Sequence, residues 1–158
     1  MLLLTLVSSC LLYESHNIIF LDGYNGSEKD VWFSFMNSAH FKSNESKMIK
    51  FSDAGITTEN YNEFFCHVEA DSLKLIFIQR GFTWEDVFPD SVIIRVWYDH
   101  VIKEQGWDSF LKTNGYYSDL YEAEYILSID DLQLLDYLIT FPPSENLVQI
   151  LSKKESAE

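Results

Sequence analysis

Cysteine, proline and glycine are scarce in this sequence, which has two Cys, three Pro and six Gly among its 158 residues. Two cysteines, Cys10 and Cys66, are too few for a disulfide framework. They suit a reducing compartment, in which each is a small buried apolar side chain. The glycines lack the spacing of a phosphate-binding loop, which excludes a nucleotide site of that type.

Basic residues are also few. Eleven Lys and Arg residues oppose 25 Asp and Glu residues, which gives a formal net charge of -14. Such a field repels phosphate, so we expect no direct nucleic-acid partner. It attracts a basic protein and speeds the encounter with it. The alternative is that the acidity only keeps the protein soluble.

Long apolar runs are absent, since no stretch approaches the roughly 18 uncharged apolar residues of a membrane span. The apolar run Met1 to Val7 leads into Val7-Ser8-Ser9-Cys10, which looks like a lipoprotein cleavage box with Cys10 as the lipidated residue. No Lys or Arg precedes this run, and it is short for a signal core. We therefore expect a cytoplasmic protein that retains the run, with a lipoprotein anchored through Cys10 as the alternative.

What the chain has is enough apolar sequence for one globular domain over residues 1–158, since 47% of its residues are hydrophobic. The run from Leu2 to Tyr13 and the run from Ile18 to Leu21 flank a polar turn and predict a β-hairpin. Alternation over Lys47–Phe51 predicts a short strand, and Leu73 to Ile78 is the clearest strand, stopped by Arg80-Gly81.

Helical spacing of apolar residues dominates elsewhere. It predicts a helix over 28–41 begun by Ser27, one that starts at Thr58 and continues through Val68, and a long one from an Asp90 cap through Ile102, with a break at Gly106. Ser128 and Asp131 predict a capping box for a helix through Ile139 that Pro142-Pro143 stops, and a last helix follows over 144–151. We therefore predict an α+β fold, with a small, mostly antiparallel sheet from the N-terminal half packed by helices and a mainly helical C-terminal half.

Catalytic signatures are incomplete. None of the four histidines pairs with another at metal-ligand spacing, and the side chains of Cys66 and His67 diverge because the residues are adjacent. His67, Glu69 and Asp71 would share one face of a strand but scatter on the predicted helix. Ser109 to Lys112 fits a Ser-x-x-Lys pattern without its companion motifs. We predict no enzyme, no catalytic residue, no metal and no cofactor. The alternative is a small hydrolase or metal-dependent enzyme that uses His67, Cys66 or His100.

The most suggestive pattern is an acidic segment interleaved with tyrosine. Between Trp107 and Glu145, eight acids are opposed by Lys112 alone. Carboxylates accept charge-assisted hydrogen bonds from Lys and Arg, while tyrosine rings stack on guanidinium groups and exclude water. The predicted partner-binding residues are Asp119, Glu122, Glu124, Asp130, Asp131, Asp136, Tyr117 and Tyr121. The alternative is a solvated helix face.

Size, acidity and aromatic content together favour an acidic, protein-binding inhibitor of immunity-protein type, which neutralises a basic toxin or nuclease by covering its positive cleft. In these respects the chain is similar to bacterial immunity proteins, although no family motif aligns with it. A DNA mimic that blocks a restriction or defence enzyme is an alternative of the same class. The enzyme that uses His67 is the alternative from another class.

Overall fold

The computed structural model describes residues 18–37, 50–114 and 120–155. The strands are β1 (Ile18–Asn25), β2 (Val31–Asn37), β3 (Phe65–Val68), β4 (Ser72–Arg80), β5 (Val92–Tyr98), β6 (Ala123–Leu127) and β7 (Leu138–Phe141). The helices are α2 (Trp84–Val87), α3 (Asp99–Gln105), α4 (Trp107–Thr113), α5 (Ile129–Leu134) and α6 (Glu145–Glu155), with 3-10 turns η1 (Ser52–Ala54) and η2 (Tyr61–Glu63).

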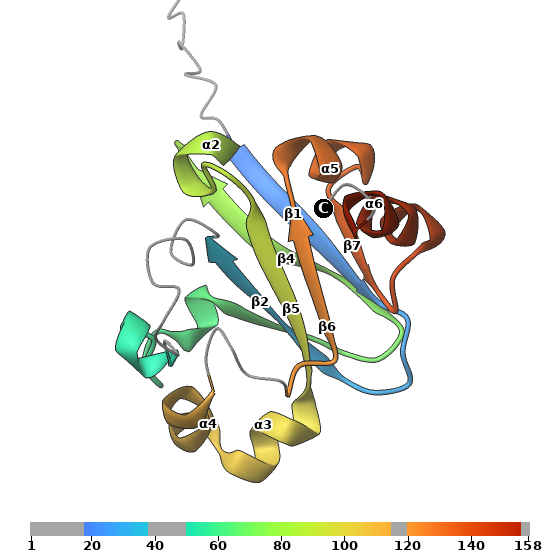
Figure 1. The fold of residues 1–158 in the computed structure, drawn as a ribbon. Helices are drawn as coiled ribbons and strands as arrows, with labels where there is room; N and C mark the ends of the chain where they lie inside the picture. The colour runs from blue at the N-terminus through green and yellow to red at the C-terminus, as the bar shows by residue number, and fades with distance from the viewer. Residues whose placement is uncertain (1–17, 38–49, 115–119, 156–158) are drawn as a thin grey trace, which may run out of the picture.

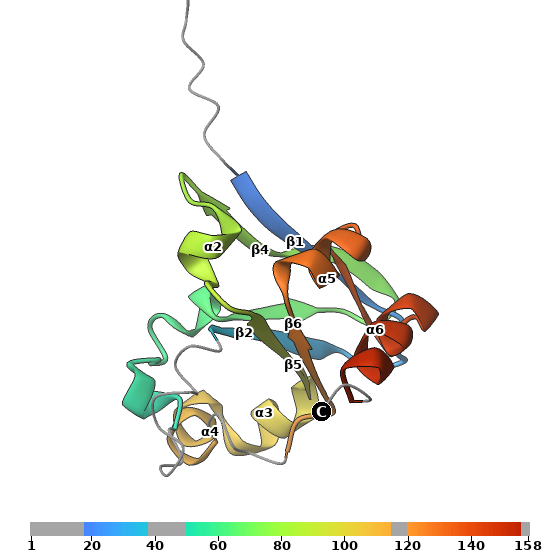
Figure 2. The same ribbon diagram turned by 45° about the horizontal axis from the view of Figure 1, so that its top comes forward.

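The strands form two sheets, one in the order β4-β1-β7 and one in the order β3-β2-β5-β6 (Figure 1). Every strand pair is antiparallel except β1 with β7, which is parallel. The two sheets stack on each other, and α3 and α4 cover the other face of the four-stranded sheet (Figure 2). This arrangement confirms the α+β class and the mostly antiparallel pairing.

Two hydrophobic cores share strand β5. Its side chains alternate, so Val92, Ile94 and Val96 enter the core between the two sheets, while Ile93 and Trp97 enter the core under α3 and α4. The Trp97 indole N–H donates to Ser34 Oγ at 2.9 Å, which satisfies its one polar atom inside the second core. Strand β5 is thus the wall between the two cores.

The prediction of a helix from Asp90 to Ile102 was wrong, because residues 92–98 form β5 and the helix begins only at Asp99. A strand that is buried on both faces shows a continuous apolar run instead of alternation, and such a run also fits a helix. The C-terminal half is therefore not only helical, since it supplies β5, β6 and β7. The predicted break at Gly106 is confirmed between α3 and α4.

Two other predicted helices are strands as well. Residues 31–37 form β2, whose Val31, Phe33 and Phe35 face the core between the sheets. The helix expected from Thr58 to Val68 is replaced by η2 and β3. In β2 both faces are apolar or aromatic, which hid the two-residue period, and β3 is only four residues long, too short to show one. The expected cap at Ser27 is a turn, since the Ser27 N–H donates to Asn25 Oδ1 at 3.1 Å.

The remaining predictions are mostly confirmed. Strands β1 and β4 form where expected, and the Ser128–Asp131 capping box starts α5. That helix ends at Leu134, however, because Asp136 and Tyr137 have positive φ angles of 51° and 57° and turn the chain into β7. Helix α6 begins at Glu145 as expected and extends to Glu155. The segments 2–13 and 47–49 lie outside the described residues. The described end of the strand expected over Lys47–Phe51 is not a strand, because Lys50 forms only an isolated bridge and Phe51 lies in the turn that leads into η1.

The double burial of β5 gives a prediction about stability. Replacing Ile94 by Ala should lower the free energy of unfolding by about 2–5 kcal/mol, because it removes a fully buried side chain and leaves a cavity. The matched control is Ile126→Ala on the neighbouring strand β6, where the side chain is 45% exposed, and it should cost less than about 1 kcal/mol. Urea unfolding of both variants measures the difference, and equal losses would contradict the assigned core.

Candidate binding surface and histidine–carboxylate cluster

Two residues of the predicted acidic segment bind an arginine of this same chain instead of facing a partner. Arg95 of β5 is buried and lies opposite Glu124 of β6 in the strand register. Its guanidinium donates to the Glu124 carboxylate at 2.5 Å and lies 4.6 Å from the centre of the Tyr121 ring. Glu124 and Tyr121, both predicted to bind a partner, therefore surround Arg95.

The other predicted acids differ in their surroundings. The Asp131 carboxylate accepts the Ser128 hydroxyl at 2.7 Å and the Ser128 N–H at 2.8 Å, so it caps α5. Glu122, Asp130 and Asp136 are exposed. Asp119 and Tyr117 lie outside the described residues. The exposed acids keep their predicted role as a hypothesis, whereas Glu124 and Asp131 have a structural role.

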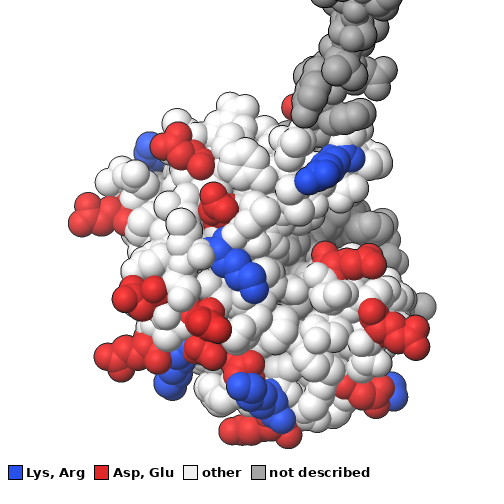
Figure 3. All heavy atoms as spheres, turned by 180° about the vertical axis from the view of Figure 1, so that it is seen from behind, with Lys and Arg blue, Asp and Glu red and all other residues white. Residues whose placement is uncertain are grey.

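An apolar stripe that the sequence did not reveal lies on the outer face of the three-stranded sheet. We call it the outer stripe, and its members are between 43% and 64% exposed: Ile18, Phe20, Leu73, Leu75 and Ile78. Phe20 pairs with Ile78 in the register of β1 and β4. On the face seen from behind, broad uncharged areas separate scattered acidic and basic side chains (Figure 3). Exposed apolar patches of this kind mark interaction sites.

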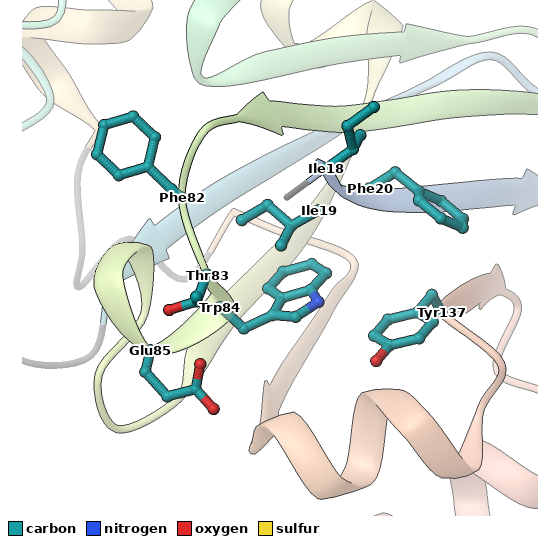
Figure 4. Close-up of a pocket in the computed structure, with 8 residues that line it drawn as sticks. All are labelled: Ile18, Ile19, Phe20, Phe82, Thr83, Trp84, Glu85 and Tyr137. Carbon is teal, nitrogen blue, oxygen red and sulfur yellow. The ribbon is translucent and has the colours of Figure 1, made fainter. Parts of the chain in front are cut away.

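A pocket of about 300 Å³ lies at one end of this stripe (Figure 4). It is lined by Ile18, Ile19, Phe20, Phe82, Thr83, Trp84, Glu85 and Tyr137. The rings of Trp84 and Tyr137 are nearly parallel, with centroids 5.6 Å apart and an interplanar angle of 3°. Glu85 follows Trp84 on α2 and is exposed. The pocket thus combines aromatic and aliphatic walls with one carboxylate.

Local backbone structure fixes the positions of Trp84 and Tyr137, two of the four aromatic residues of this pocket. Thr83 caps α2 through a capping box with Asp86, which fixes the start of the turn that carries Trp84. Tyr137 has a left-handed backbone, and its carbonyl accepts the Asp22 N–H at 2.9 Å. Non-glycine residues in this conformation cost roughly 1–2 kcal/mol each, and such strain is often kept at ligand sites.

His67 lies in a cluster that differs from the one considered in the sequence. Because residues 65–68 form a strand, its side chain meets Asp30, which precedes β2, and Asp99 at the start of α3. The His67 Nε2 atom is 3.5 Å from Asp30 Oδ2 and 3.9 Å from Asp99 Oδ1. Glu69 and Asp71 are not part of this cluster.

Asp99 is the best-held member of the cluster. It accepts the Trp32 indole N–H at 2.9 Å through Oδ1 and the Lys103 ammonium at 2.5 Å through Oδ2. Burial by itself raises the pKa of Asp99. The hydrogen bonds from Lys103 and Trp32 and the positive charge of Lys103 outweigh burial, so this pKa lies below the usual value for aspartate. Asp99 is therefore ionised at neutral pH.

The other catalytic candidates are separated from this cluster. Burial raises the pKa of the Cys66 thiol, although Lys74 opposes the shift, so the reactive thiolate is disfavoured. His100 is exposed and stacks on Tyr98. Lys112, the lysine of the Ser-x-x-Lys pattern, forms a surface ion pair with Asp108 on α4, with 2.8 Å between the charged atoms. This ion pair explains the position of Lys112 without any role in activating a serine.

No family model matches the chain, and no curated protein or solved structure shows significant similarity to it. Within the described residues, no helix has both the length and the apolar character that crossing a membrane requires.

The pair of Arg95 and Glu124 gives a prediction that separates structure from binding. Glu124→Ala should lower the free energy of unfolding by about 2–4 kcal/mol, because it leaves a buried guanidinium without this carboxylate. The control Glu122→Ala removes an exposed acid and should change stability by less than about 0.5 kcal/mol. If thermal or urea unfolding shows Glu124→Ala to be as stable as the control, the pair has no structural role.

Proposed function

We propose that this protein is an acidic inhibitor of immunity type that binds a basic protein partner, a toxin or a nucleic-acid-processing enzyme. The observation that supports it best is the carboxylate-bearing pocket beside the exposed outer stripe, on a chain with a net charge of -14. The proposal places the protein in the cytoplasm. A lipid anchor at Cys10, which lies outside the described residues, is the alternative.

The chemistry of the pocket fits a Lys or Arg side chain of the partner. The long methylene stem of such a side chain packs against apolar walls, here Phe20, Trp84 and Tyr137, while its charged head stays near solvent. Glu85 supplies the opposite charge on the same pocket. An aromatic wall adds a cation–π attraction of about 0.5–2 kcal/mol.

Different residues control how fast the partner binds and how fast it dissociates. Exposed apolar side chains of the outer stripe lose water on binding and set the rate of dissociation. The excess of acids sets the rate of association, and it includes the exposed Glu122, Asp130 and Asp136 of the acidic segment. Asp136 directly precedes Tyr137 of the pocket, so the end of that segment borders the proposed site.

The anchors are tested by capturing the partner from an extract of the native host. The wild-type chain should retain one strongly basic protein in stoichiometric amount, and the double variant Phe20→Ser, Ile78→Ser should weaken that complex about tenfold or more. The matched control is Val148→Ser on α6, since Val148 is 46% exposed and Phe20 and Ile78 are 43% and 46% exposed. A partner that binds all three proteins equally well would contradict the proposed face.

The steering acids are tested by the salt dependence of the association rate of the purified pair. Raising the salt should slow association steeply, because exposed charges are screened beyond about 8 Å at physiological ionic strength. Reversing Glu122, Asp130 and Asp136 to Lys should slow it further and flatten the salt dependence, with the dissociation rate changing less. An association rate that changes with neither salt nor the charge reversal would show that these acids serve only solubility.

Competition by duplex DNA for the same partner would assign the protein to the DNA-mimic class.

A further inference from the structure

We propose that Asp30, His67 and Asp99 form a binding site for a divalent zinc-like cation. Each residue offers one ligand atom, and the three atoms lie within 4.8 Å of one another. This set of one imidazole and two carboxylates suits zinc, with water completing the coordination. The site shares no residue with the pocket of the proposed function, so each stands or falls separately.

The distances favour a shared cation over direct hydrogen bonds. A His N–H donating to a carboxylate lies about 2.7–3.2 Å from the oxygen, whereas the two distances here are 3.5 and 3.9 Å. In a tetrahedral zinc site with bonds of about 2.0–2.2 Å, neighbouring ligand atoms lie roughly 3.3–3.5 Å apart. The two separations from His67 Nε2 are close to that spacing, and all three ligand atoms lie within 4.8 Å of one another, so the carboxylates have to move closer together to bind one ion.

Paired backbones fix the positions of the three ligands. Trp32 pairs with His67 between β2 and β3, which places Asp30 close to His67 at the end of the sheet. The Asp99 N–H donates to the Asp30 carbonyl at 3.0 Å, which ties the start of α3 to the same point. His67 lies within β3, while Asp30 directly precedes β2 and Asp99 directly follows β5, so paired strands hold all three positions.

Outer hydrogen bonds orient both carboxylates. Asp30 Oδ1 accepts the Ala70 N–H at 3.0 Å, which leaves Oδ2 directed toward His67. The Trp32 indole N–H donates to Asp99 Oδ1, the same oxygen that lies 3.9 Å from His67 Nε2, and so fixes the position of that ligand atom. The Trp32 ring lies against His67 with centroids 5.0 Å apart. Such partners are typical of metal sites, where they fix the geometry of the ligands. The side chains of Asp30 and His67 are 39% and 29% exposed, so a cation can enter from solvent.

Lys103 competes with the cation for Asp99. Its ammonium contacts Asp99 Oδ2, but the Lys103 side chain is 72% exposed, so the ammonium can leave the buried Asp99 carboxylate and return to water. With Lys103 in place, two carboxylates and one ammonium give a formal charge of -1, and without it the charge is -2. Removing the lysine should therefore strengthen the binding of a dication.

Titration of the full chain with Zn²⁺ and Co²⁺ after treatment with a chelator tests the site. We expect one ion per chain by calorimetry and a Co²⁺ absorption spectrum of four-coordinate type. Co²⁺ should also quench tryptophan fluorescence, because Trp32 lies against His67. His67→Ala and Asp30→Asn should each weaken binding about tenfold or more. Asn at position 30 keeps an oxygen for the Ala70 N–H, so the fold is preserved. Lys103→Met should tighten binding.

The matched control is His100→Ala, which removes an exposed histidine of α3 and should leave affinity unchanged. Absence of saturable binding of either ion to the folded wild-type chain would overturn the proposal. Binding that persists unchanged in both His67→Ala and Asp30→Asn, or that His100→Ala abolishes, would also overturn it, since the ion would then lie elsewhere on the surface. Circular dichroism of each variant confirms that the fold is intact.

Discussion

The burial of strand β5 on both faces is the constraint on which the rest of the structure depends. One face of the strand closes the core between the sheets, and the other supports the helices α3 and α4. Arg95 lies within this strand, so a cation in the middle of the molecule requires Glu124 and Tyr121 beside it. The chain leaves β5 directly into Asp99, so the same strand also positions the histidine–carboxylate cluster.

Local signals in the sequence predicted local structure well. The capping box of Ser128, the break at Gly106 and the strand β4 each depend on a few neighbouring residues, and all three are confirmed. Strands β2 and β5 were read as helices because both of their faces are apolar, which removes the alternation that identifies a strand. The predicted α+β class is still correct, because strands β1 and β4 were predicted as strands.

The candidate sites show the same limit. A sequence shows that Glu124 is acidic, but only the pairing of β5 with β6 shows that it neutralises Arg95. The partners of His67 come from two segments remote in the chain, and their approach follows from a sheet register that no spacing rule contains. The apolar run Leu73 to Ile78 predicted a strand but not which of its residues solvent reaches, and only Ile76 of β4 is buried.

The central claim is that a basic partner contacts the pocket and the outer stripe. Peptide-level amide hydrogen exchange of the chain, alone and saturated with the captured partner, tests it most directly, because exchange reports local protection along the whole backbone. Exchange should slow on binding in residues 81–88 and 135–138, which carry the pocket residues outside β1. Slower exchange confined to α3, α4 or α6, with those two segments unchanged, would contradict it.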